Sequence, residues 1–267
     1  MKKLLVLIFL FPVFSVFAQE KEILSKLDAK ADFYGDLARQ IWSNPELGYL
    51  ETNSSQLLQK TLSDAGFKVT AGVAGIPTAF VAEYGSGKPV IGIMAEFDAL
   101  PGVSQEAVSF RKPVVVGGAG HACGHHLFGA ASVAAGISVM DWMKANKIKG
   151  TVRVYGTPAE EGGGGKVYMA RAGLIQDVDA MLHWHPSSQN AAGATSSLAN
   201  ISTKFRFYGE ASHAAAAPER GKSALDAVEA MNFMVNLMRE HVPMQTRMHY
   251  VITRGGEAPN VVPAFAE

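Results

Sequence analysis

The chain has 267 residues, of which 48% are hydrophobic and 18% are charged, enough for one large or two modest globular domains. Lysine plus arginine and aspartate plus glutamate number 24 each, and no basic run occurs. This balance argues against an electrostatic affinity for nucleic acid or for an anionic membrane surface.

The first 18 residues have the pattern of an export signal. Lys2 and Lys3 precede an apolar run over residues 4–17, which is too short to cross a membrane comfortably. Val16 and Ala18 place small residues where a signal peptidase reads them. We therefore expect cleavage after Ala18 and a periplasmic or secreted product. The alternative is a short membrane anchor.

Helix-like and strand-like patterns alternate over residues 19–197, which we assign to a first domain. The expected helices cover residues 22–43, 52–65, 127–145 and 166–172, and the expected strands cover 67–70, 78–84, 90–95, 150–155 and 178–183. Thr52 or Asn53 is the expected cap of the second helix, and Gly66 ends it. This alternation predicts an α/β fold with a mostly parallel mixed sheet and helices on both faces.

The pattern changes after residue 197, and we assign residues 198–267 to a second, α+β domain. Residues 201–208 alternate like a half-buried strand, and residues 249–253 form a further expected strand. Between them, residues 223–241 carry an apolar stripe at helical spacing, with Ser223 and Asp226 as the expected cap.

The only cysteine and five of the eight histidines fall within residues 121–185. Cys123 and His125 lie two residues apart on a glycine-flanked loop, where both side chains can point to one place. Thiolate and imidazole are ligands that zinc selects. The alternatives are a buried cysteine that packs as a small hydrophobe, or a nucleophilic cysteine–histidine pair. His121 and His126 are either further ligands or residues that support the ligands.

Other polar residues lie at the end of the third, fourth and fifth expected strands or shortly after them. They are Asp98, Glu160, Glu161, His183 and His185. The carboxyl ends of the strands in such a sheet meet at one edge, so we expect these groups to share a site. Of the two adjacent glutamates, one can bind metal while the other transfers protons, although a solvated acidic pair is the alternative. Only one of the two histidines need be a ligand, and Asp98 is either the residue that orients a ligand imidazole or a turn acid.

Several motifs in register give the chain a family likeness. They are Pro45–Gly48, Ala95–Gly102, Cys123–His125, Pro158–Gly162, Trp184–Pro186, Ser212–Ala214 and Gly255–Pro263. In this combination the chain resembles the dinuclear metal amidohydrolases and metallopeptidases related to aminoacylase, carboxypeptidase G and the plant auxin-conjugate hydrolases. Within that family it is similar to the branch that contains p-aminobenzoyl-glutamate hydrolase. The likeness covers nearly the whole chain after the export signal.

The resemblance implies that residues 19–197 are a catalytic, metal-binding domain with a zinc-peptidase-like fold, and it also implies a site and a reaction. Two divalent metals, zinc or manganese, would be bound by Cys123, His125, Glu161 and His185. Glu160 would be the general base for a metal-activated water that attacks the amide carbonyl, and would then protonate the leaving nitrogen.

The resemblance also implies roles for the second domain. Residues 198–267 match the lid domain of the relatives, which mediates a homodimer in which His213 would reach the partner's site and stabilise the oxyanion. Asn260 matches the lid asparagine that grips the substrate. The implied substrates are N-acyl or aroyl amino acids, similar to p-aminobenzoyl-glutamate, or small peptides.

Two features depart from the family pattern. Many relatives carry aspartate after Cys-Gly-His, where this chain has His126. Relatives are also longer, so the resemblance implies a C-terminally truncated chain that stops within the lid at Glu267 and lacks the family's last histidine ligand. The alternative functions are a dipeptidase or N-deacylase on the same scaffold, or a catalytically inactive fragment that binds metal or oligomerises.

Overall fold

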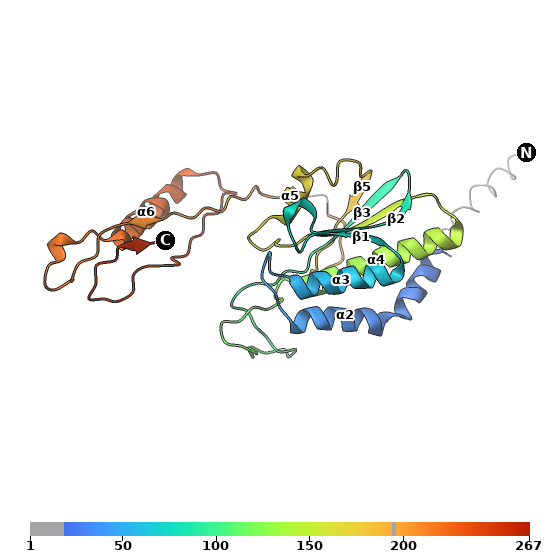
Figure 1. The fold of residues 1–267 in the computed structure, drawn as a ribbon, viewed down its shortest axis with the longest axis horizontal. Coiled ribbons are helices and arrows are strands. Elements are labelled where there is room, and N and C mark those ends of the chain that lie inside the picture. Colours follow the sequence, from blue (N-terminus) through green and yellow to red (C-terminus); the bar gives the residue numbers. More distant parts are fainter. Residues whose placement is uncertain (1–18, 194–195) are drawn as a thin grey trace, which may run out of the picture. The chain divides into compact units, whose positions relative to one another are not determined.

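A five-stranded mixed sheet lies at the centre of the N-terminal part of the chain (Figure 1). The strand order is β1-β2-β4-β3-β5, with β1 (Lys68–Ala71), β2 (Phe80–Ser86), β3 (Val90–Ala95), β4 (Gly150–Gly156) and β5 (Ala180–Leu182). Strands β4, β3 and β5 run parallel, and β1 and β2 are antiparallel to their neighbours. The nearly continuous apolar run of β3 suits a strand that is covered on both faces.

Helices cover both faces of this sheet, so the predicted α/β class is confirmed. The helices are α2 (Ala31–Ser43), α3 (Thr52–Ala65), α4 (His125–Asn146) and α5 (Gly165–Arg171). The core on one face joins α2, α3 and α4 to the strands, and the core on the other face includes Met169 of α5. A side chain at Gly136 of α4 would meet Val154 at 2.4 Å, so this glycine allows the helix to pack closely on β4.

Two details of the helices differ from the sequence prediction. The helix expected over residues 22–43 is divided by a turn at residues 29–30. The expected cap of α3 was wrong, because Glu46 lies before the helix and accepts hydrogen bonds from the backbone N–H groups of Asn53 (2.9 Å) and Ser54 (2.8 Å). A glutamate can replace a local cap in this way because its carboxylate satisfies two free N–H groups at once. Gly66 ends the helix as expected, with a φ of 110°.

The structure, a computed structural model, describes residues 19–193 and 196–267, which form two compact units. The first ends at Asn190 and the second covers Ala191–Glu267, whereas the sequence assignment put the boundary at residue 198. The predicted export signal lies outside the described residues. Over the described ranges, every helix is too short or too polar to span a lipid bilayer.

The second unit is a small α+β structure. Helix α6 (Ala224–Met238) begins at Ser223, whose hydroxyl accepts a hydrogen bond from the backbone N–H of Asp226 (3.1 Å), as predicted. The strand expected over residues 201–208 is reduced to β6 (Phe207–Tyr208), which pairs with β7 (Phe265–Ala266). Residues 249–253 are not a strand. Alternation of apolar residues predicts which face is buried, but a strand also needs a neighbour to bond with.

Candidate metal centre

The ends of the three parallel strands place polar residues at one edge of the sheet. Glu96 and Asp98 follow β3, Glu160 and Glu161 follow β4, and His183 and His185 follow β5. The loop before α4 adds Cys123 and His125. We call Glu96, Cys123, His125, Glu160, Glu161 and His185 the donor cluster.

Cys123 and His185 are in direct contact within the donor cluster. The Cys123 sulfur lies 3.3 Å from Nε2 of His185, and one ligand atom each of Cys123, His125 and His185 lie within 4.8 Å of one another. Gly124 makes this approach possible, because it has a φ of 86° and a Cβ there would meet Pro186 at 2.9 Å. Three segments distant in sequence thus bring a thiol and two imidazoles together.

His125 is fully buried and is oriented by Asp98. Its Nδ1 lies 2.9 Å from an Asp98 carboxylate oxygen and 3.1 Å from the Asp98 carbonyl oxygen. The second carboxylate oxygen of Asp98 accepts a hydrogen bond from the backbone N–H of Glu161 (2.7 Å). Asp98 therefore positions two members of the cluster, and the turn-acid alternative does not describe these contacts. With Nδ1 bonded to Asp98, Nε2 of His125 faces the cluster.

Three carboxylates of the cluster act on the thiol of Cys123. Burial, together with the nearby carboxylates of Glu161, Glu160 and Glu96, raises the pKa of the Cys123 thiol to about 12. One oxygen of Glu161 is buried and lacks a hydrogen-bond partner in the described part of the chain. Such a grouping of anionic groups is unfavourable unless a cation neutralises it.

Glu51 holds the backbone just before the glutamate pair through hydrogen bonds. This buried carboxylate accepts hydrogen bonds from the N–H of Ala159 (2.7 Å) and the hydroxyl of Thr78 (3.0 Å). Burial raises the pKa of Glu51 above its ordinary value. Ala159 has a φ of 55°, a conformation that a non-glycine residue adopts only where its surroundings hold it. Glu51 fixes this strained turn, which presents Glu160 and Glu161.

Glu96 is a member of the cluster that sequence reasoning missed. Its carboxylate, 2% exposed, contacts Lys166 (2.5 Å), His183 (3.2 Å) and His125 (3.0 Å). Glu96, His125 and Glu160 form a second group whose ligand atoms lie within 4.8 Å of one another. The signal was present in the sequence, because Glu96 precedes Asp98 by two residues after the same strand and so lies on the same side of the chain.

The composition of the donor cluster fits divalent metals. Thiol, imidazole and carboxylate are the ligands that zinc selects, and carboxylate and imidazole also suit manganese. Within the described residues, Nε2 of His125, one oxygen of Glu96 and one oxygen of Glu161 are buried without a hydrogen-bond partner. These atoms are the ones that a metal would satisfy. The assignment of Cys123, His125, Glu161 and His185 as ligands stays a prediction.

The remaining histidines of the first unit lie beside the cluster. His121 and His126 pack at a ring-centre distance of 5.3 Å, and His126 packs edge-on against Trp42 at 4.8 Å. Burial lowers the pKa of both histidines to about 4, so both rings are neutral at pH 7. Neither belongs to the two groups with metal-binding geometry in the described residues. His183 contacts Glu96 instead of Cys123, so the two histidines after β5 have different partners.

His213 and Asn260 lie in the second unit, on neighbouring segments. The backbone N–H of Ala214 donates to the carbonyl of Asn260 (3.0 Å), and Nδ1 of His213 accepts from the N–H groups of Ala215 and Ala216. Both side chains are exposed. Their predicted roles in catalysis and substrate binding stay predictions.

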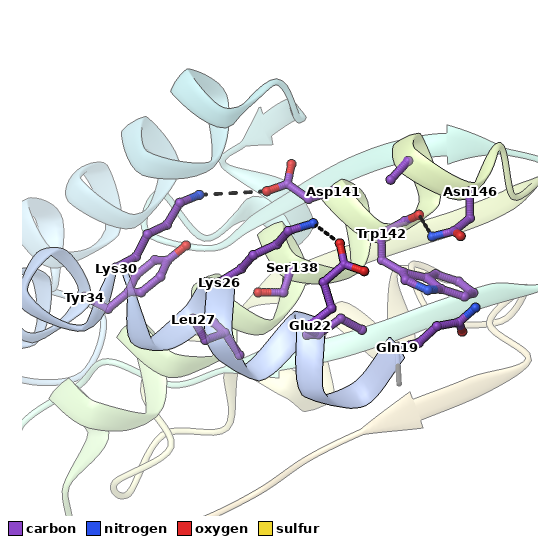
Figure 2. Close-up of a pocket in the computed structure, with 12 residues that line it drawn as sticks. Gln19, Glu22, Lys26, Leu27, Lys30, Tyr34, Ser138, Asp141, Trp142 and Asn146 are labelled. Carbon is purple, nitrogen blue, oxygen red and sulfur yellow. Dashed lines mark hydrogen bonds and ion pairs between the residues drawn. The ribbon is translucent and has the colours of Figure 1, made fainter. Parts of the chain in front are cut away.

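Two cavities in the first unit differ in size and position. The larger, of about 620 Å³, is lined mainly by apolar residues of the loop 104–120 and by Trp42, with His121 in its wall. This volume is in the range of small-molecule sites. The smaller, of about 50 Å³, lies between residues 19–34 and α4 and is lined by Lys26, Tyr34 and Trp142 among others (Figure 2). It has room for little more than a water molecule and lies outside the donor cluster.

An α/β sheet with thiol, imidazole and carboxylate groups at the carboxyl ends of its strands is an architecture suited to a metal-dependent hydrolase. Residues 92–262, more than half of the chain, match the model of the peptidase family M20/M25/M40. The chain therefore belongs to this family, and the likeness inferred from its motifs is confirmed.

Individual relatives agree with this assignment. The chain is 47% identical to a subunit of p-aminobenzoyl-glutamate hydrolase from Escherichia coli, over 90% of this chain and 50% of that protein. It is 33% identical to Xaa-Arg dipeptidase of Mus musculus, over 94% of this chain and 58% of that protein. The fold is similar to that of a dinuclear metal-binding peptidase of Bacillus subtilis, with a TM-score of 0.51 and 23% identity over 90% of this chain and 63% of that one. The chain thus spans little more than half the length of the curated relatives it matches.

Proposed function

We propose that the chain acts in a metal-dependent hydrolase of the amide bond in N-acyl or aroyl amino acids similar to p-aminobenzoyl-glutamate. The observation that carries this proposal is the convergence of Cys123, His125 and His185, whose ligand atoms lie within 4.8 Å of one another at the ends of separate segments. The 47% identity to the p-aminobenzoyl-glutamate hydrolase of Escherichia coli supports the substrate class.

In this proposal Cys123, His125, Glu161 and His185 hold two divalent metals, zinc or manganese. The neighbour from Bacillus subtilis, a dinuclear metal-binding peptidase, supports two rather than one. Bound metals of this kind polarise a carbonyl and lower the pKa of water. Asp98 supports the site by keeping the Nδ1 side of His125 occupied, so that Nε2 remains directed toward the cluster.

Glu160 is the proposed general base. Its side chain is exposed, whereas the adjacent Glu161 is half-buried and faces the Cys123 thiol. An exposed carboxylate at the mouth of the cluster can take a proton from water and deliver it to the leaving nitrogen. Glu161 lacks this freedom because Asp98 holds its backbone.

The larger cavity would hold the acyl side of the substrate. Its walls include Trp42, Val108, Val114 and Val115, which suit an aromatic or aliphatic acyl group. His121 in the same wall lies two residues before Cys123, so the cavity borders the cluster.

The substitution Glu160→Gln tests the proposal. We expect hydrolysis of p-aminobenzoyl-glutamate to fall by about 10²- to 10⁴-fold, with the bound metal per chain unchanged, because only the proton transfer is removed. Glu219→Gln, at an exposed position of the second unit, is the matched control. Both are measured on the 267-residue chain and on any longer natural form that contains it. Full activity in Glu160→Gln would contradict the role of Glu160.

Two alternatives are separated by the same assay. The 33% identity to Xaa-Arg dipeptidase favours a dipeptidase as the second candidate, and a panel of aroyl-glutamates, N-acetyl amino acids and Xaa-Arg dipeptides distinguishes the two. Tight metal binding without hydrolysis of any member of the panel would favour a metal-binding or oligomerising protein without turnover.

We further propose that the protein is exported and forms a homodimer through the second unit. The export signal pattern of residues 1–18 supports the first statement. Helix α6 supports the second, since its apolar side chains Phe233, Met234 and Leu237 are each more than half exposed. Cell fractionation and sedimentation analysis of the chain test these two points, and a cytoplasmic product or a monomer would contradict them.

A further inference from the structure

Two side chains, Lys166 and His183, hold one oxygen of the Glu96 carboxylate in place. This oxygen, Oε1, lies 2.5 Å from Nζ of Lys166 and 3.2 Å from Nε2 of His183. Glu96 is therefore a buried carboxylate whose orientation is set by Lys166 and His183.

The other oxygen of Glu96 faces the donor cluster. Oε2 lies 3.0 Å from Nε2 of His125, yet neither atom makes a hydrogen bond within the described part of the chain. With Nδ1 of His125 bonded to Asp98, Nε2 is directed toward Oε2, where it carries either a proton or a free lone pair. In the metal-free chain a proton on Nε2 makes this contact favourable, and a divalent ion that binds both atoms would take the place of that proton.

The distance itself fits a shared metal. Two ligand atoms that each lie about 2.1 Å from one ion and subtend about 90° at it are about 3.0 Å apart. The carboxylate of Glu160 lies in the same group, within 4.8 Å of both other donors, and so borders the same position.

We propose that Glu96 is a metal ligand, whose Oε2 binds the divalent ion that Nε2 of His125 holds. This inference rests on the proposed function, because it assumes that the donor cluster binds metal. It adds an anionic ligand to the set that the sequence motifs imply. It also gives Lys166 and His183 a role, since their contacts hold the other oxygen of Glu96 and aim the carboxylate.

The test measures metal binding rather than activity. The chain is dialysed against Zn²⁺ or Mn²⁺ alone, and the bound metal per chain and its affinity are measured for the wild type and three variants. In Glu96→Gln we expect one of two metals to bind at least about 10- to 100-fold more weakly, since even residues outside the ligand shell cost this much. Glu46→Gln is the matched control, because the carboxylate of Glu46 is bonded to Asn53 and Ser54 and belongs to neither group of ligand atoms among the described residues.

A third variant separates a ligand from a structural partner. Lys166→Met removes the strongest contact of Glu96 but keeps its carboxylate, so we expect two metals to remain bound. If Glu96 served only to anchor Lys166, Lys166→Met would weaken metal binding as much as Glu96→Gln does, and the proposal would be wrong. Wild-type affinity for both metals in Glu96→Gln would also overturn it.

The outcomes distinguish this inference from the function on which it rests. Two metals in the wild type and in Glu96→Gln would refute only the role of Glu96, whereas a wild type that binds no metal would refute the proposed function as well. If Glu96→Gln does not fold, the crystal structure of the wild type grown with Mn²⁺ or Zn²⁺ decides. A Glu96 oxygen about 2.0–2.2 Å from the ion supports the proposal, and one beyond about 3.5 Å overturns it.

Discussion

The two units of the chain hold their polar residues in different ways. In the first unit, His125 and Asp98 are fully buried beneath a large core that joins three helices to the sheet. In the second unit, His213 and Asn260 are exposed, and the core contains only Ala224, Val228 and Ala266 as buried residues among those described. In the first unit close packing restrains the side chains themselves, whereas in the second unit the contacts described above restrain mainly the backbone. Ligands that must meet at one point therefore belong in the first unit, and residues that act by approach from outside can belong in the second.

The largest effect is expected from removing the buried histidine of the first unit. His125→Ala leaves the carboxylates of Glu96 and Asp98 facing a space without a cation, and it removes the donor shared by both groups of ligand atoms. We expect metal binding to be lost and the metal-free chain to lose about 3–5 kcal/mol of unfolding free energy in urea.

The neighbouring histidine provides the control for this variant. His126→Ala removes a half-buried imidazole that packs on Trp42 and contacts none of the cluster carboxylates at ion-pair distance within the described residues. It should keep its metals and lose less stability. Equal loss of metal in both variants would show that the histidine pair, and not His125, forms the site.

The sequence predicted the scaffold of the first unit better than its cluster. Strand β3 was expected at residues 90–95 and lies at Val90–Ala95, because a short apolar run bounded by turn residues leaves few alternatives. The rule that sites form at the carboxyl ends of strands placed Asp98, Glu160 and His185 together in advance. The same rule could not predict the partners of Glu96, because Lys166 contacts Glu96 from α5 and His183 contacts it from the end of β5.

The second unit was harder to predict for a physical reason. The apolar alternation of residues 201–208 is real, but only Phe207 and Tyr208 find a bonding partner, and that partner is the two-residue strand Phe265–Ala266. The start of helix α6 was predicted correctly, because the cap at Ser223 depends only on residues three positions apart. Pairing between distant segments is not encoded in a local pattern.

A smaller effect is expected at the glycine that lets the cysteine loop approach Pro186. Gly124→Ala combines a left-handed backbone, which costs about 1–2 kcal/mol, with a contact to Pro186 that costs about 1–3 kcal/mol more. We also expect weaker metal binding, because Cys123 and His185 flank this contact. Gly87→Ala is the control, since Gly87 has a φ of 79° and open space around it. Equal losses of stability in the two variants would show that the Pro186 contact contributes nothing.

The smallest effect is expected in the second unit, and it tests whether this unit unfolds independently of the first. Ser223→Ala removes the hydroxyl that accepts the Asp226 N–H, so we expect about 0.5–2 kcal/mol of local stability to be lost from α6. Ser223→Asp keeps an acceptor and should restore most of it. Hydrogen exchange resolved by segment is the measurement: amides of α6 should exchange faster, while those of β3 and β4 stay protected. Faster exchange in β3 and β4 as well would mean that the two units unfold together. The difference in packing between the two units would then not correspond to a difference in their stability.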